Sequence, residues 1–413
     1  MGMEHEKKST LIPIEEAQAR ILENLPETQS ELTGIAHACG RYALQTLLST
    51  VPLPLFDNSA MDGYAVSHSD LKGATPEKPV VLHLQDMVRA GQAARQSLKS
   101  GNCIRVFTGA PVPVGTTAVV MQEDTREFGR EVQFLAPPKP WEFVRFRGED
   151  IKAGDVIINT GEQISSRHIA VLASVGEEKV LVGKAPRISI LVTGDELATP
   201  GAKLESGQIY ESNGPMIRSM VQSSGGKIVE CVRMGDNLDS LQALLTQFSQ
   251  KSEIILTTGG ISVGKFDLVK AAWEAAGGYW DTSRVRMKPG KPFSIGRKDS
   301  AKCLLLALPG NPVSAAMTFT LFVYPAIRRL SGAALTFPLP QYAPAGQNFS
   351  NQGPRTEFAR IRLDSKNGTV ISAGPQGSHH LRSLAQSDGF IRIDNLTEIK
   401  AGDLIPYFPW PFM

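Results

Sequence analysis

The sequence predicts a multi-domain protein of the α/β plus β class, and three features of the 413-residue chain lead to this prediction. Short apolar runs alternate with amphipathic helical segments between Pro186 and Leu330. Strand-like runs divided by glycine and proline fill the stretch from Val51 to Phe146, and the same texture returns after Ser331. We therefore expect a doubly wound, mostly parallel sheet domain, with β-rich domains before and after it.

The N-terminal part of the chain has helical spacing. Apolar residues recur with a helical period from Ile14 to Leu25, and a second short helix fits residues 41–48. Helical character resumes at residues 166–176, after the β-rich stretch. We therefore expect one discontinuous helical domain, formed by residues 8–48 and 148–183, and a β-rich insertion domain of residues 49–147.

Residues 184–330 alternate strictly between strand and helix. Predicted strands lie at residues 188–192, 227–234, 253–256 and 303–308. Predicted helices lie at residues 213–226, 238–250, 266–278 and 312–330. In such open α/β sheets a ligand binds in the crevice beyond the carboxyl ends of the strands, so we look for chemistry there.

The pattern of residues 331–413 predicts a small C-terminal β domain, a β-barrel or a sandwich. The segment 358–374 alternates apolar and polar residues, and its Asn367-Gly368 pair is typical of a hairpin turn. Short strand-like runs continue from residue 389 to residue 408.

Composition and charge exclude several classes of function. A net charge of +2 gives no reason to expect a nucleic-acid or anionic-membrane partner. The first ten residues are polar and lack the apolar core of a signal peptide, so we expect a cytoplasmic protein. The four cysteines form no C-x-x-C pair and the seven histidines are scattered, which argues against a structural zinc site.

A loop rich in glycine and hydroxyl groups follows the third predicted strand, at residues 257–264. Glycines allow backbone N–H groups to approach an oxyanion closely, and the start of the following helix adds a favourable dipole. The loop matches neither the P-loop nor the dinucleotide-binding pattern. It suggests a phosphate or oxyanion, although a tight turn with no ligand would look the same.

Acidic residues recur at the same edge of the predicted sheet: Asp195, Glu196, Asp236 and Asp267. Carboxylates that converge on a phosphate site are the ligands Mg²⁺ requires, so all four are candidate metal ligands. Individually, Asp236 or Asp267 is equally well explained as a helix N-cap or a solvated turn residue.

Cationic residues supply the counterpart. Lys288 and Lys291 lie in a loop stiffened by proline and glycine, which reduces the entropy lost on binding an anion. Arg145 and Arg147 lie on one side of an extended segment. A surface turn and an exposed strand are the respective alternatives.

Nine motifs, in this order, resemble the molybdopterin molybdenumtransferase family and the E domain of gephyrin: FDNSAMDGYAV, FTGAPVP, VVMQED, RGEDI, TGDEL, TTGGISVG, KPGKPF, LPGNPVSA and QGSHH. The resemblance extends from about Ile14 to Tyr407. It implies a homodimer of four-domain subunits with one molybdopterin-binding α/β domain. It also implies a Mg²⁺-dependent reaction in which molybdate and adenylylated molybdopterin give the molybdenum cofactor and AMP, with a molybdopterin adenylyltransferase as upstream partner.

The resemblance also assigns roles to individual residues. Catalytic roles fall on Asp62, Thr108, Glu196, Asp236 and Asp267. Substrate contacts fall by this resemblance on Lys288, Lys291, Arg145, Arg147 and Ser378. The place of the loops after the predicted strands adds Gly259, Gly260, Ser262, Gly264 and Asn311. The chain departs from the family pattern at Lys265 and Phe146, where an acidic and a basic residue respectively are common. A non-catalytic molybdopterin carrier or a gephyrin-like scaffold is the alternative function.

Overall fold

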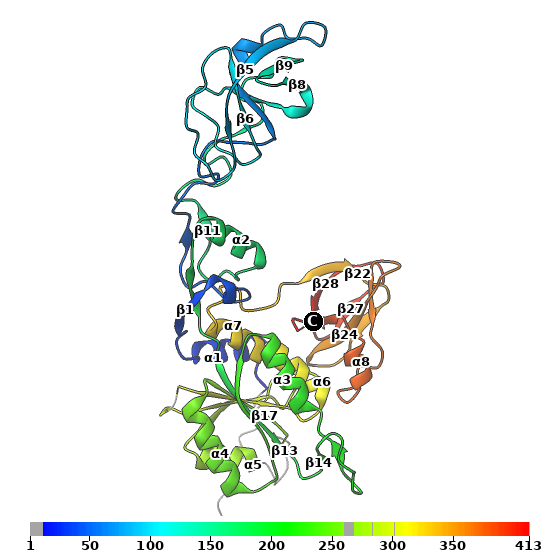
Figure 1. Cartoon of the computed structure of the whole chain (residues 1–413). Helices are drawn as coiled ribbons and strands as arrows, with labels where there is room; N and C mark the ends of the chain where they lie inside the picture. The colour runs from blue at the N-terminus through cyan, green and yellow to red at the C-terminus, as the bar shows by residue number, and fades with distance from the viewer. Residues whose placement is uncertain (1–10, 260–267, 283, 301, 413) are drawn as a thin grey trace, which may run out of the picture. The chain divides into compact units, whose positions relative to one another are not determined.

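The computed structural model describes residues 11–259, 268–282, 284–300 and 302–412. The chain forms two compact units (Figure 1). Unit 1 comprises Met1–Gln45, Thr160–Ser165 and Lys179–Met413, and unit 2 comprises Thr46–Asn159 and Ser166–Glu178.

The central sheet of unit 1 has six strands. Their order is β16 (Lys227–Met234), β13 (Arg187–Thr193), β17 (Ile254–Thr258), β21 (Leu304–Leu308), β20 (Ser294–Arg297) and β18 (Tyr279–Thr282). The first four strands run parallel, whereas β20 and β18 are antiparallel to their neighbours. The predicted mostly parallel sheet is therefore confirmed.

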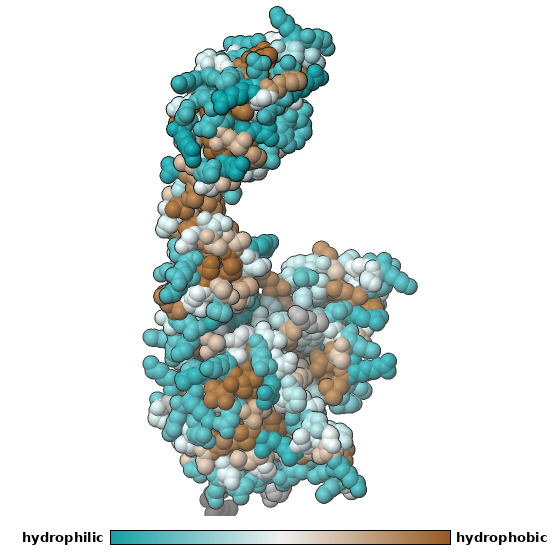
Figure 2. All heavy atoms as spheres, viewed as in Figure 1, coloured by the Kyte–Doolittle hydropathy of each residue, from teal (hydrophilic) through white to brown (hydrophobic). Residues whose placement is uncertain are grey.

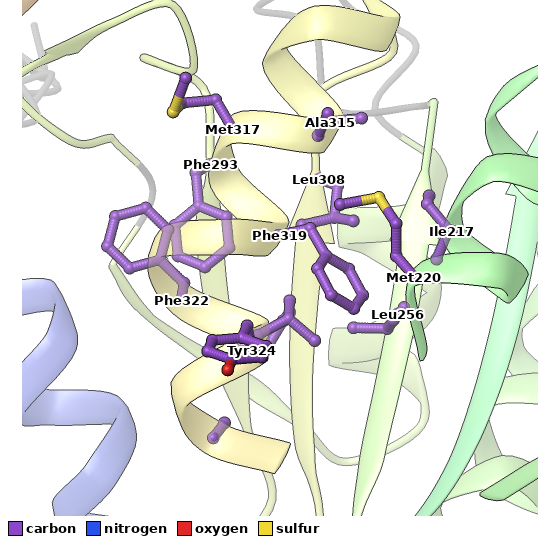
Figure 3. Packing of buried hydrophobic residues seen from close by; sticks show 14 of the residues in the cluster. Ile217, Met220, Leu256, Phe293, Leu308, Ala315, Met317, Phe319, Phe322 and Tyr324 are labelled. Carbon is purple, nitrogen blue, oxygen red and sulfur yellow. The ribbon is translucent and has the colours of Figure 1, made fainter. Parts of the chain in front are cut away.

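Helices cover both faces of this sheet (Figure 1). One face carries α1 (Ile14–Glu23), α3 (Asn213–Ser223), α6 (Pro312–Thr318), the π-helical turn η4 (Phe319–Val323) and α7 (Tyr324–Leu330). The other face carries α4 (Leu238–Lys251) and α5 (Leu268–Ala275). The single helix expected over residues 312–330 thus contains a π turn, beside which Phe293 and Phe322 stack with ring centroids 4.3 Å apart (Figure 3).

A second sheet lies in the C-terminal part of unit 1. Its order is β19 (Met287–Lys288), β24 (Thr356–Asp364), β26 (Gly389–Ile393), β28 (Leu404–Pro409) and β22 (Gln341–Pro344), with β25 (Thr369–Ser372) on β24. A separate pair joins β23 (Phe349–Asn351) to β27 (Thr397–Ile399), and α8 spans Leu381–Ala385. The antiparallel pairing of β24 with β25 confirms the hairpin at Asn367-Gly368. The closure of these strands into a barrel stays a prediction.

The N-terminal segment contains more strand than we expected. In unit 1, β1 (Ser30–Gly34) pairs with β12 (Lys179–Gly183). The helix predicted at residues 41–48 is wrong, because Tyr42 and Ala43 form bridges to Gln163 and Val182. These partners are distant in sequence, so a short apolar pattern could not reveal them.

Unit 2 is the β-rich part. Its six-stranded sheet has the order β7 (Ala118–Met121), β4 (Gly63–Val66), β6 (Asn102–Val106), β5 (Val80–Val88), β9 (Glu131–Phe134) and β8 (Thr125–Phe128). Two short pairs complete it, β3 (Asn58–Ser59) with β10 (Val144–Arg145) and β2 (Leu47–Leu48) with β11 (Val156–Ile158). The helix α2 (Ser166–Ser174) appears where the sequence predicts one.

Surface hydropathy is mixed on the face shown in Figure 2, where hydrophobic groups lie among hydrophilic ones. Within the described ranges, no helix has the length and apolar character needed to cross a bilayer.

Candidate active site

The carboxyl ends of the parallel strands lie side by side in unit 1. Strand β13 ends at Thr193, β17 at Thr258 and β21 at Leu308, and the strands pair in the order β13, β17, β21. Candidate residues from the sequence follow each of these strands: Asp195 and Glu196 follow β13, Gly259 follows β17 and Asn311 follows β21. Sheet topology therefore brings the loops after these strands to one edge, as the crevice rule for open α/β sheets requires.

Asn213 ties three of the segments at this edge together, and the sequence did not mark it. Its amide Nδ2 donates to Thr258 Oγ1 at 2.9 Å and to the carbonyl oxygen of Gly310 at 2.7 Å. The residue is buried at the first position of α3. A buried amide that donates to both strand-end loops fixes their spacing. In the sequence, only its place in the Asn-Gly-Pro start of a predicted helix could have drawn attention to Asn213.

Several buried polar atoms at this edge lack hydrogen-bond partners. Within the part of the chain that the structure describes, Thr193 Oγ1, Thr257 Oγ1 and Asn213 Oδ1 are buried and unpartnered. An unpartnered buried acceptor costs about 1–3 kcal/mol, so three of them at this edge of the sheet require a reason. A polar ligand at the strand ends would supply it.

Carboxylates follow the two adjacent strands β13 and β16. The Asp236 backbone N–H donates to Asp195 Oδ1 at 3.2 Å. Desolvation raises the pKa of Asp236, and the charges of Asp195 and Glu196 raise it further. Such mutual repulsion is what a bound cation relieves. Among the described residues, however, no group of three acidic, histidine or cysteine ligands surrounds one point.

Part of the predicted site lies outside the described residues: Gly260, Ser262, Gly264 and Asp267, together with Lys265. Gly259 is described, and it has a φ of +89°. A Cβ placed on it would lie 2.2 Å from the carbonyl oxygen of Thr193. The backbone after β17 can therefore approach the end of β13 this closely only with glycine at position 259.

The two predicted lysines differ in their surroundings. Lys288 Nζ forms an ion pair with Glu357 Oε2 of β24 at 3.1 Å. Lys291 is exposed and has no ion-pair partner within the described ranges. Lys288 ends β19 and Lys291 lies between β19 and β20, and an anion that binds Lys288 has to compete with Glu357.

The C-terminal sheet contributes the loop that carries Ser378. Asn311 Nδ2 donates to Ser378 Oγ at 3.2 Å, and the backbone N–H of Val313 donates to the Ser378 carbonyl at 3.2 Å. The predicted substrate-contacting residues Asn311 and Ser378 are therefore neighbours. They connect the loop after β21 with the C-terminal domain.

A buried arginine that the sequence did not mark supports this loop. Arg360 in β24 is fully buried, and burial lowers its pKa. Its Nη2 donates to the carbonyls of Pro375 at 2.8 Å and Gly377 at 3.2 Å, and its Nε donates to Ser383 Oγ at 3.0 Å. The sequence pattern of β24 could not reveal the burial of Arg360, because an arginine in a strand is normally expected to be exposed.

A second group of predicted residues lies in unit 2. Asp62 Oδ1 accepts the backbone N–H of Thr108 at 2.7 Å and its hydroxyl at 2.8 Å. These hydrogen bonds lower the pKa of Asp62, and the one from the backbone N–H has the larger effect. Asp62 precedes Gly63, where a Cβ would lie 2.0 Å from the carbonyl oxygen of Val120, so this sheet position requires glycine.

Arg147 begins the fourth motif, RGEDI, and Arg145 comes two residues before it; this segment lies beside the first motif. Arg145 in β10 pairs with Asn58 in β3, and the Arg147 backbone N–H donates to Asp57 Oδ1 at 2.7 Å. Unit 2 thus brings together the segments around residues 57–62, 108 and 145–147. The remaining described residues of the predicted site lie in unit 1, so the site residues form two groups.

Comparisons with known proteins cover nearly the whole chain. Three family models match: the MoeA N-terminal region (domain I and II) over residues 12–176, a probable molybdopterin binding domain over residues 189–329, and the MoeA C-terminal region (domain IV) over residues 342–410.

Curated relatives and solved structures agree with these matches. Molybdopterin molybdenumtransferase 2 of Mycobacterium tuberculosis is 36% identical over 94% of this chain and 97% of its own length. Molybdopterin molybdenumtransferase of Haemophilus influenzae is 33% identical over 97% and 99%. The molybdopterin biosynthesis MoeA protein of Pyrococcus horikoshii superposes with a TM-score of 0.81 at 27% identity, over 97% of this chain and 100% of that one.

Proposed function

The chain belongs to the molybdopterin molybdenumtransferase family, whose members are transferases of molybdenum cofactor biosynthesis, and on that premise we propose that it inserts molybdenum from molybdate into adenylylated molybdopterin and releases AMP. The observation that carries the proposal is the edge formed by β16, β13, β17 and β21. It places carboxylates beside buried polar atoms that have no protein partner among the described residues.

The substrate's pterin and phosphates would bind at this edge. Backbone N–H groups of the loop that begins at Gly259 would approach the phosphate oxygens, since glycine leaves the backbone accessible. The unpartnered oxygens of Thr193, Thr257 and Asn213 would accept the amino and ring N–H groups of the pterin. Lys291 and Ser378 would bind molybdate or phosphate oxygens.

Mg²⁺ fits the donor set at the strand ends. This ion takes oxygen ligands, and one or two carboxylates commonly hold it together with phosphate oxygens and water. Asp195 and Asp236 would hold it, with Glu196 and Asp267 as further candidate ligands. Burial, and then the charges of Asp195 and Glu196, raise the pKa of Asp236. When bound it neutralises charge on the substrate's pyrophosphate.

Asp62 would handle protons during metal insertion. The pterin dithiol releases two protons when its sulfurs bind the metal, and one oxo ligand of molybdate takes up both protons and leaves as one water molecule. The Asp62 carboxylate accepts both hydrogen bonds from Thr108, and this held carboxylate would relay a thiol proton to the departing oxygen. Catalysis would otherwise consist of positioning and electrostatic stabilisation.

The assembly and setting of the enzyme are part of the same proposal. We propose a cytoplasmic homodimer that receives adenylylated molybdopterin from a molybdopterin adenylyltransferase. The near-neutral charge of +2 supports a small-molecule substrate rather than nucleic acid or a membrane surface.

AMP release from adenylylated molybdopterin, with molybdate and Mg²⁺ present, tests the function directly. We expect molybdate-dependent release by the wild type and its loss in Glu196→Ala. Glu274→Ala is the matched control, because Glu274 is exposed on α5 of the same domain. Tight binding of the pterin without AMP release would instead identify a carrier or scaffold and contradict the proposal.

A further inference from the structure

Arg105 of β6 contacts the residues on both sides of the Asp62–Thr108 pair. It lies directly opposite Tyr64 of β4 in the antiparallel register, so the two side chains share one face of the sheet. Arg105 Nη1 donates to Tyr64 Oη at 2.7 Å, and its Cζ lies 4.8 Å from the centre of that ring. Tyr64 is buried and is separated from Asp62 by Gly63 alone.

The other guanidinium nitrogen is connected to Asp62 through Gln122. Arg105 Nη2 donates to Gln122 Oε1, and the backbone N–H of Gln122 donates to the Asp62 carbonyl oxygen at 3.1 Å. Cζ of Arg105 also lies 5.6 Å from the ring centre of Phe107, the residue before Thr108. One planar group thus contacts the neighbours of both hydrogen-bonding partners.

Glu127 of β8 completes the network. It accepts a hydrogen bond from Tyr64 Oη, and its Oε2 lies 3.8 Å from Arg105 Nη1. The carboxylate neutralises the guanidinium at a position where the Arg105 side chain is only 16% exposed. Arg105 is therefore held in one orientation. A side chain has to be fixed in this way before it can position its neighbours.

We propose that Arg105 is a positioning residue for the Asp62–Thr108 pair, acting through Tyr64 and Gln122. The inference rests on the proposed function insofar as that function makes the pair part of the reaction. Tyr64 and Gln122 each accept a hydrogen bond from a different nitrogen of the guanidinium group. Lysine has a single nitrogen and cannot present two donors in this planar arrangement. The geometry itself, a fixed Thr108 N–H on Asp62, is independent of the reaction.

The test compares Arg105→Lys and Arg105→Ala with Arg126→Lys in the full-length protein. Arg126 is an exposed arginine of β8 in the same sheet, so its substitution controls for a change of arginine as such. Amide hydrogen exchange of Thr108 and Gln122 reports the positioning without turnover. We expect exchange at both amides to accelerate about tenfold or more in the Arg105 variants, while the urea midpoint of unit 2 falls only slightly.

Turnover gives the second readout. We expect kcat for AMP release to fall about 100-fold in Arg105→Ala with KM for the pterin little changed, because misplacement by about 1 Å has that cost. Millimolar guanidinium should restore part of kcat in Arg105→Ala and none in Asp62→Ala. If Arg105 only stabilised the sheet, kcat would not fall separately from KM, and guanidinium would not restore kcat.

The outcomes separate the two proposals. Unchanged exchange at Thr108 and Gln122 would overturn the positioning role, whatever the activity. Accelerated exchange in a protein whose wild type releases no AMP would support the positioning geometry and reject the proposed function. Accelerated exchange with an undiminished kcat would show that the reaction does not use the pair's position, and this also overturns the inference.

Discussion

Asp62 and Thr108 are joined through a single oxygen, because Asp62 Oδ1 accepts both the backbone N–H and the hydroxyl of Thr108. Both hydrogen bonds favour the ionised carboxyl group and lower the pKa of Asp62 below its ordinary value. A depressed folded-state pKa contributes stability that is present above the ordinary aspartate pKa. That contribution is lost as the pH falls through the depressed value.

Thr108→Val should raise the pKa of Asp62 toward its ordinary value. Valine keeps the backbone N–H but lacks the hydroxyl, so one of the two hydrogen bonds is lost. The carboxyl ¹³C shift of Asp62, titrated through the acid range, measures the change. Thr75→Val, which removes another exposed threonine hydroxyl of unit 2, should leave the titration where it was. No shift in Thr108→Val would mean that the backbone hydrogen bond alone controls Asp62.

Asn213→Ala should destabilise unit 1 more than a typical polar truncation does. It removes the donors to Thr258 Oγ1 and the Gly310 carbonyl and leaves buried acceptors unpaired, which should cost about 2–4 kcal/mol. Asn237→Ala offers the comparison, because Asn237 caps α4 at the surface and its loss should cost about 1 kcal/mol. Urea unfolding of both variants measures the difference. Equal costs would show that Asn213 does not hold the strand-end loops together.

Gly259→Ala should disrupt the loop after β17 through a steric clash. Gly259 and Gly277 both have positive φ, so alanine strains the backbone at either position by about 1–2 kcal/mol. Only at Gly259 does the new Cβ meet backbone, 2.2 Å from the Thr193 carbonyl oxygen, whereas at Gly277 the nearest atom is the end of a lysine side chain. We expect Gly259→Ala to lose pterin affinity and more stability than Gly277→Ala. Similar results from calorimetric titration and unfolding would rule out the clash.

Long periodic segments explain why the α/β domain could be predicted from the sequence. Strands such as β21 consist of consecutive apolar residues, because both faces of a parallel sheet are covered. The segment at residues 41–48 was too short for its period to be decisive. Its structure depends on pairing of Ala43 with Val182, which lies far away in the sequence.

The candidate site divides in the same way. Asp195, Asp236 and Asn311 were predictable because polar residues directly after strands reach a common edge of the sheet. Arg360 and Arg105 were not predictable, because an alternating strand pattern classes every arginine as an exposed polar residue. Their surroundings come from segments that only the folded chain brings together.

Arg360→Lys should destabilise unit 1 even though it keeps the positive charge. The guanidinium donates to two carbonyls of the loop before Ser378 and to Ser383 Oγ, and one ammonium group cannot match that fork in a closed site. We expect a loss of about 2 kcal/mol in the free energy of unfolding, together with a raised KM for molybdate as Ser378 moves away from Asn311. Arg362→Lys is the matched control, because Arg362 is exposed on the same strand. If both variants unfold at the same urea concentration, Arg360 does not support the Ser378 loop.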